Sequence, residues 1–324
     1  MITKLEMRSR NSKNKYDLKN AVSDVKLTTD MNYTAGQLDF SIISTGNYRV
    51  KNGDIVIFNW SKNKTFYGYV FKWDVDEKGK ITVLAYDKLR YLKNNDSIVM
   101  PVGSISSRFK TIAKRAQIKA KVVKSSSHKL KSELFDNKSY FDILKSGIKA
   151  TYRATGTRYF LKDNYGTVEL RKYPYKTLKL SLGDNYSVIS YKMERSIDNA
   201  ANYIKVVNDD SSTSKKKVTS IKMKKAKGNS VSRWGQLTYV DKATGKTNAA
   251  QMKERAKKLL KQKNKQTNSL SLTTLGHVDL IAGNSVVVNI KDLKKVGVGK
   301  KRFLIKKATH TFGTKYTVDL ELSV

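Results

Sequence analysis

The chain has no cysteine, two prolines and three histidines among 324 residues. Without cysteine, neither a disulfide framework nor a thiolate metal site can form, and the composition is compatible with a reducing cytoplasm. Two prolines are too few for a proline-rich linker, and we therefore expect the domains of the chain to pack together. The amino-terminal segment lacks the apolar stretch of a secretory signal, and no run approaches 18 apolar residues. We therefore expect no membrane span, and a chain that is soluble or part of a soluble particle.

Acidic residues are also scarce. Sixty-five Lys and Arg stand against 27 Asp and Glu, a formal net charge of +38, and the lysines are spread from Lys4 to Lys315. Self-repulsion of this size destabilises a compact monomer or a homo-oligomer unless apolar interfaces or an anionic partner offset it. The composition therefore indicates an anionic partner or a charged cavity.

Catalytic constellations are largely missing. His128, His277 and His310 are far apart and have no partner at metal-ligand spacing, so we expect structural or surface roles, with His310 hydrogen-bonded in a strand. Residues 244–247 read T-G-K-T, but Val240 stands where a phosphate loop needs its first glycine. No G-x-S-x-G motif is present. The sequence predicts no enzyme, no metal and no cofactor, although two carboxylates brought together by folding could still cut peptidoglycan.

A two-residue hydrophobic period runs from Gly36 to Tyr86. Apolar side chains alternate in four segments, and turn-forming residues separate them at 51–53, 61–64 and 77–79. This close spacing predicts a strand meander in an antiparallel barrel or sandwich.

Helical spacing replaces the strand pattern after Tyr91. One apolar stripe follows Ser104, and a second follows Ser139, whose pairing with Asp142 resembles a capping box. Two short apolar segments then flank residues 163–166, which predicts a hairpin. Residues 96–172 therefore read as a small α+β module.

The strand pattern returns from Ser187 to Leu322. One helix near residues 248–262 interrupts it, opened by Asn248 and Gln251 as a capping box. We expect three domains: a β-rich region over 1–95, the α+β module over 96–172, and a second β-rich region over 173–324. Part of 173–240 is expected to pack onto the first region.

The densest run of lysines marks a candidate polyanion contact, although a solvated hairpin explains the same run equally well. Its members are Lys215, Lys216, Lys217, Lys222, Lys224, Lys225 and Lys227. Basic residues also alternate with aromatic ones at 153–160 and 171–175, as in single-strand nucleic-acid platforms and in ordinary strand faces.

The order of segments resembles that of baseplate hub proteins of contractile-tailed phages, T4-type and defective-prophage hubs included, and of bacteriocin-like particles. The resemblance spans nearly the whole chain and depends on the collinear order of its segments. These segments are 53–56, 66–71, 84–93, 134–139, 196–205, 279–286 and 308–312.

This resemblance implies a mainly β chain with two tube-like antiparallel β-barrel domains and a small α+β domain. Three copies would form a ring of six barrels that joins a hexameric tail tube to a trimeric central spike. The implied partners are the tube, spike and other baseplate proteins, with the tape-measure protein or DNA in the lumen. The implied location is the tail baseplate of a virion or tail-like particle, assembled in the bacterial host cytoplasm. Some tail hubs carry an added wall-lytic or wall-binding domain, and we expect none in this sequence.

Two other functions stay open from the residues alone. A free basic nucleic-acid-binding β-barrel protein would bind with an affinity that falls steeply with salt. A cell-wall hydrolase would need two convergent carboxylates.

Overall fold

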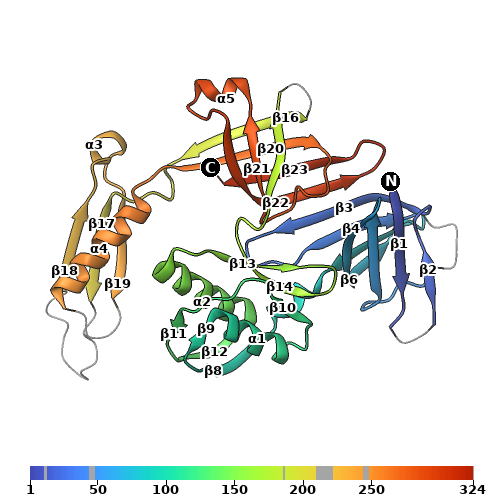
Figure 1. The fold of residues 1–324 in the computed structure, drawn as a ribbon, viewed down its shortest axis with the longest axis horizontal. Helices are drawn as coiled ribbons and strands as arrows, with labels where there is room; N and C mark the ends of the chain where they lie inside the picture. Colours follow the sequence, from blue (N-terminus) through green and yellow to red (C-terminus); the bar gives the residue numbers. More distant parts are fainter. Residues whose placement is uncertain (11–12, 44–47, 185–186, 209–221, 244–247, 324) are drawn as a thin grey trace. The chain divides into compact units, whose positions relative to one another are not determined.

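The chain divides into two compact units in the computed structural model (Figure 1). The structure describes residues 1–324 except 11–12, 44–47, 185–186, 209–221, 244–247 and 324. Unit 1 comprises Met1–Lys192 and Leu270–Val324, and unit 2 comprises Met193–Ser269. Unit 2 is therefore an insertion in the sequence of unit 1. The three-domain division at residues 95 and 172 stays a prediction.

In the part of the chain that the structure describes, thirteen strands form the main sheet. They are β1 (Ile2–Arg8), β2 (Lys15–Asp17), β3 (Val22–Asp30), β4 (Gln37–Ile42), β5 (Ile55–Trp60), β6 (Asn63–Val75), β7 (Ile81–Tyr86), β15 (Thr177–Gly183), β16 (Val188–Ser196), β20 (Thr267–Leu275), β21 (Ser285–Asn289), β22 (Lys301–Phe312) and β23 (Thr317–Ser323). A short helix, α5 (Lys291–Lys295), lies between β21 and β22.

The main sheet joins the two ends of the chain. Its strand order is β16-β20-β23-β22-β3-β4-β7-β6-β5-β1-β2, with β21 paired to β22 and β15 paired to β21. The antiparallel pair β22–β3, in which His310 lies opposite Leu27, connects the carboxy-terminal strands to the amino-terminal ones. The prediction of a mainly β chain is confirmed. Over the described residues this strand path is open and does not close into a barrel.

Alternation along the strands builds the core beneath the amino-terminal half of the sheet. Leu38, Phe40 and Ile42 of β4 are buried against Val83 and Ala85 of β7. Strands β5, β6 and β7 follow one another as predicted, but β4 pairs with β7 rather than with β5. The predicted meander is therefore wrong at its first strand, because turn spacing does not show which strands pair across a longer connection.

The other face of β6 carries a row of aromatic rings. Tyr69 and Phe71 make ring contacts with Tyr91, at centroid distances of 5.8 and 6.0 Å. Tyr67 contacts Tyr165 at 5.9 Å. The period-two pattern of β6 thus serves two interfaces, an apolar core on one side and an aromatic layer on the other.

Residues 88–172 form the α+β part of unit 1. It contains the 3-10 helix η1 (Lys88–Lys93), β8 (Asn95–Met100), β9 (Gly103–Ser104), α1 (Ile105–Arg115), β10 (Ala120–Val122), β11 (Lys129–Leu130), β12 (Glu133–Ser139), α2 (Tyr140–Thr155), β13 (Tyr159–Asp163) and β14 (Val168–Lys172). The strands pair as β10-β14-β13, β11-β9 and β12-β8. β13 and β14 form the predicted hairpin.

Both predicted helix starts in this part are confirmed. The hydroxyl of Ser104 accepts from the N–H of Ser107 at 3.2 Å, and that of Ser139 accepts from the N–H of Asp142 at 3.1 Å. Gly156 ends α2 at a φ of 69°, a left-handed conformation that glycine adopts without strain. Local sequence chemistry thus sets the ends of these helices.

The described residues of unit 2 form a small three-stranded sheet with one long helix. Its elements are β17 (Tyr203–Asn208), β18 (Lys222–Lys227), α3 (Val231–Trp234), β19 (Thr238–Ala243) and α4 (Ala249–Lys263). β17 lies between β18, which is antiparallel to it, and β19, which is parallel to it. The predicted capping box is confirmed, because Asn248 and Gln251 each accept the other's backbone N–H, at 2.8 and 3.0 Å. No helix in the described parts of either unit is long and apolar enough to cross a membrane.

Candidate polyanion-binding surface

The predicted lysine run falls on unit 2. Lys215, Lys216 and Lys217 lie outside the described residues, whereas Lys222, Lys224, Lys225 and Lys227 belong to β18. Whether these lysines contact a polyanion stays a prediction, but the structure shows which residues accompany them.

The position of α4 determines the two faces of the sheet in unit 2. Ile204 and Val206 of β17 are fully buried and pack with Met252 and Ala256 of α4. Because side chains alternate along a strand, Tyr203, Lys205 and Val207 lie on the opposite face.

Register adds the lysines of the neighbouring strands to this opposite face. Lys225 and Lys227 of β18 pair with Lys205 and Tyr203. On β19, Lys242 pairs with Val207. We call this surface the open face of unit 2; the members whose side chains the structure describes are Tyr203, Lys205, Val207, Lys225, Lys227, Thr238, Val240 and Lys242.

The open face is accessible and basic. Lys225, Lys227 and Lys242 are exposed, and Val240 is 52% exposed. Tyr203 and Lys205 are half-buried, with the Lys205 Nζ 5.8 Å from the centroid of the Tyr203 ring. A ring and four ammonium groups therefore share one sheet surface.

Acidic side chains near the sheet pair elsewhere. Asp241 binds Arg255 of α4, and Glu254 lies 3.7 Å from the Nζ of Lys258. No carboxylate of the described residues pairs with the four lysines of the open face. Over residues 193–269 the sequence has 19 Lys or Arg against 6 Asp or Glu, so unit 2 is strongly basic as a whole. This arrangement can attract phosphates or carboxylates through point charges.

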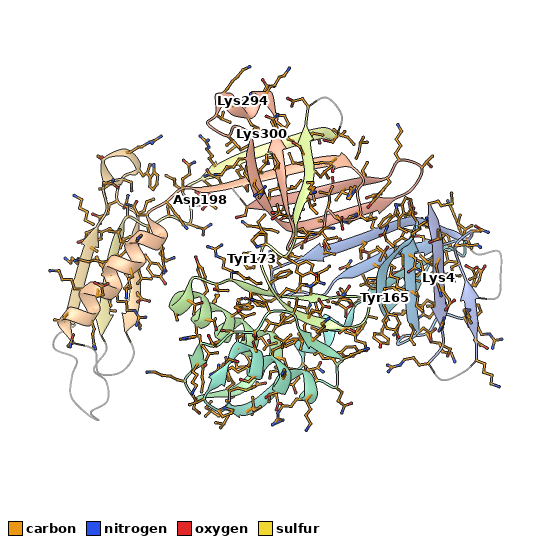
Figure 2. The ribbon with its side chains drawn as sticks, in the orientation of Figure 1. Lys4, Tyr165, Tyr173, Asp198, Lys294 and Lys300 are labelled. Carbon is orange, nitrogen blue, oxygen red and sulfur yellow. The ribbon has the colours of Figure 1, made fainter. Side chains whose placement is uncertain are left out.

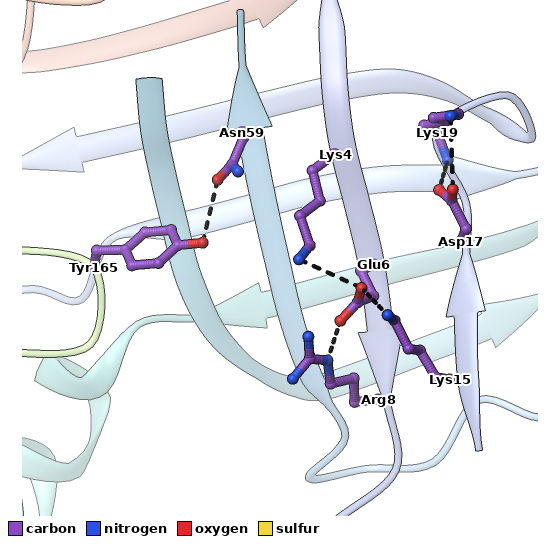
Figure 3. Close-up of polar contacts among 8 residues, drawn as sticks. All are labelled: Lys4, Glu6, Arg8, Lys15, Asp17, Lys19, Asn59 and Tyr165. Carbon is purple, nitrogen blue, oxygen red and sulfur yellow. Dashed lines mark hydrogen bonds and ion pairs between the residues drawn. The ribbon is translucent and has the colours of Figure 1, made fainter. Parts of the chain in front are cut away.

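The amino-terminal strands show the contrasting case, in which cations are neutralised internally (Figure 3). Glu6 of β1 is 4% exposed, and Lys4 and Lys15 place their Nζ atoms 3.4 and 3.1 Å from its Oε2. Arg8 donates to the other carboxylate oxygen. Burial raises the pKa of Glu6, but the hydrogen bonds from Arg8 and Lys15 help to lower it below its ordinary value. These three cations already have an anionic partner.

The rest of the positive charge is spread over many elements (Figure 2). Lys294 on α5 and Lys300 before β22 are examples in unit 1. The open face differs from these positions because register brings together four lysines that have no ion pair among the described residues.

In the two predicted aromatic and basic segments, several side chains contact one another, and whether these segments bind nucleic acid stays a prediction. Tyr159 and Phe160 are buried, and the guanidinium of Arg158 lies 4.5 Å from the Tyr152 ring. The Arg171 guanidinium lies 3.8 Å from the Tyr175 ring, and its Nε donates to Glu169 at 2.7 Å. These side chains interact with one another, as the ordinary strand-face interpretation expects.

His310 has the structural role that its strand position predicts. It is 1% exposed, its Nδ1 lies 2.7 Å from the Tyr316 hydroxyl, and its Nε2 lies 3.1 Å from the Leu280 carbonyl oxygen. Burial lowers the pKa of His310 to about 4. No group of three or more His, Asp or Glu in the described part of the chain could hold a metal ion.

A buried ionisable cluster connects the sheet to the α+β part. Asp87 caps η1 by accepting from the N–H of Leu89 at 2.9 Å, and it also accepts from the N–H of Gly36 at 2.9 Å. Burial raises the pKa of Asp87 well above its ordinary value, and it also raises the pKa of Asp163. Burial lowers the pKa of Lys162 to about 8. Because both oxygens of Asp87 accept from backbone N–H groups, its role is to position η1.

The fold of the chain resembles that of solved phage tail proteins. The 43 kDa tail protein of prophage MuSo2 from Shewanella oneidensis is similar to this chain with a TM-score of 0.71. The likeness covers 98% of this chain and 97% of that protein at 13% sequence identity, so it concerns the fold. The predicted resemblance to tail proteins is confirmed at this level.

The chain belongs to the YqbQ-like family, whose model matches residues 25–323. Two relatives come from Bacillus subtilis (strain 168). YqbQ, described as uncharacterized, is 29% identical over 279 residues, which are 85% of this chain and 82% of the relative. XkdQ, a protein of the phage-like element PBSX, is 27% identical over 279 residues with the same shares.

Proposed function

We propose that the protein is a structural component of a phage tail or tail-like particle, the hub of its baseplate. The observation that carries the proposal is the likeness of fold to a prophage tail protein over nearly the full length of both chains. A relative from the phage-like element PBSX supports it independently through sequence.

In the finer form of this proposal, three copies form a ring between a hexameric tail tube and a trimeric spike. A threefold object matches a sixfold one when each subunit presents two similar surfaces. The amino- and carboxy-terminal strand sets, joined through β22 and β3, are the candidates for these surfaces. Each would act as a tube-like barrel domain, with residues 96–172 as the module between them.

The proposed partners are the tube, the spike and other baseplate proteins, with the tape-measure protein or DNA in the lumen. The proposed particle is a contractile tail, assembled in the bacterial host cytoplasm. The role is adaptor and support, without catalysis.

The molar mass of the protein in solution tests the proposed ring of three copies. Light scattering on the purified chain in high-salt buffer, where repulsion between copies is screened, is expected to give three times the 36.7 kDa of one chain. Imaging of purified particles is expected to show three copies at the tail tip. A protein that stays monomeric at every concentration and is missing from particles would contradict the proposal.

A further inference from the structure

We propose that the open face of unit 2 is a nucleic-acid-binding surface, in which its lysines contact phosphates and Tyr203 stacks on a base. The inference goes beyond the hub proposal, because it concerns one sheet of unit 2 and does not depend on ring formation.

The lysines of the open face lie close enough together for their charges to repel one another. Lys225 and Lys227 are two residues apart on one strand, which places their Cα atoms about 7 Å apart. Lys205 lies directly opposite Lys225, where cross-strand Cβ atoms are about 5 Å apart. These separations lie within a Debye length of roughly 8 Å at physiological salt, so the ammonium groups repel one another. A chain of phosphates relieves this repulsion and releases its own counterions.

The composition of the open face favours nucleic acid over an acidic protein surface. Lysine is depleted in the cores of protein–protein interfaces, where aromatic and apolar side chains dominate. Among the described side chains of the open face, four are lysines and two, Val207 and Val240, are aliphatic.

Tyr203 adds an aromatic ring, on which a base can stack, to the charged groups of the open face. Its half-buried ring lies in the sheet among the lysines, and Lys205 Nζ is 5.8 Å from its centroid. Single-strand binding proteins combine such rings, on which bases stack, with basic side chains that follow the backbone. A sheet covered by helix on one face and open on the other is also the platform used by RRM domains.

The helix supplies a matched control within the same unit. Lys253, Lys257, Lys258 and Lys261 are exposed on α4, on the covered side of the sheet. Changing four lysines to glutamine on either side removes the same charge from the same unit. The two sets differ in position, because only the open-face lysines lie beside Tyr203 on the sheet.

The test measures binding of the full chain to fluorescein-labelled oligodeoxythymidylate, and to duplex DNA of equal length, by fluorescence anisotropy over a salt series. Replacing Lys205, Lys225, Lys227 and Lys242 by glutamine is expected to weaken single-strand binding about tenfold or more and to reduce the salt slope by about 3. The α4 set is expected to weaken it by no more than about threefold, through long-range charge alone. Circular dichroism spectra of both variants serve to check that each one is folded.

The Tyr203→Leu variant separates stacking from charge. It is expected to weaken single-strand binding about fivefold or more, because each stacked base contributes measurably. Duplex binding is expected to stay unchanged, because paired bases are not available to the ring.

Several outcomes would overturn the proposal. They are failure of the native chain to bind either DNA, equal losses from the two lysine sets, or a Tyr203→Leu variant that binds like the native chain. Polyglutamate that displaces the probe as well as unlabelled oligonucleotide does at equal charge would assign the surface to an acidic protein instead. A trimer mass measured for the open-face variant would leave the hub proposal intact in each of these cases.

Discussion

Individual buried groups in unit 1 show how this basic chain satisfies polar atoms inside a β structure. The carboxylate of Glu6 lies among three cations, whereas Asp87 accepts two backbone N–H groups and carries a raised pKa. His310 has a polar partner at each ring nitrogen. Burial prevails for Asp87 and His310, whose pKa values shift toward the neutral form despite their hydrogen bonds, whereas the three cations around Glu6 outweigh burial and favour its charged form.

His310 is expected to make the stability of unit 1 depend on pH in weak acid. Its pKa is lowered to about 4 in the folded chain, against 6.5 when unfolded, so the unfolded state binds more protons between these values. The free energy of unfolding should therefore fall as pH decreases from 6.5 to 4, by up to about 3 kcal/mol from this group. Urea unfolding at a series of pH values measures it.

The His310→Gln variant should be less stable at neutral pH and show a shallower loss across this window. His128→Gln removes an imidazole elsewhere in unit 1 and is the matched control. Equal pH profiles for the native chain and His310→Gln would contradict the assignment.

Secondary-structure elements show both the reach and the limit of sequence-based prediction. Ser104, Ser139 and Asn248 predict helix starts correctly, because a cap is a local hydrogen bond. The alternation of Leu38, Phe40 and Ile42 likewise identifies the buried face of β4. Local patterns thus predict much of the element content after residue 36.

Pairing between distant strands could not be predicted in this way. Strand β4 pairs with β7, and β22 pairs with β3 across the length of the chain. The open face of unit 2 depends on the same kind of information, because Lys205 and Lys242 join Lys225 only through register. The lysine run was visible in the sequence, but its partners and Tyr203 were not, since strand order is a property of the tertiary fold.

The capping box of α4 is expected to contribute measurably to unit 2. Asn248→Ala removes the side-chain acceptor for the N–H of Gln251, which should cost about 1 kcal/mol of helix stability. Hydrogen exchange of the α4 amides is the suitable measurement, because it reports on unit 2 separately. Gln262→Ala, at an exposed position on the same helix, should leave these rates nearly unchanged. Faster exchange in both variants alike would argue against a specific role for the cap.

At the scale of the whole molecule, the positive charge should make stability depend on ionic strength. A formal charge of +38 creates repulsion in the folded chain that salt screens. We expect the melting temperature to rise by a few degrees from low to physiological salt. Differential scanning calorimetry measures this, with sucrose as a control that stabilises without screening charge. A melting temperature that falls with added salt would show that attractive ion pairs, such as those of Glu6, dominate instead.

Unit 2 is inserted between two strands that lie side by side in the main sheet. The chain departs along β16 and returns along β20, and these two strands are neighbours in the main sheet. Domain insertion is tolerated best where the flanking ends already lie close together. We therefore expect changes in the length or charge of unit 2 to leave the strand order of the main sheet unchanged.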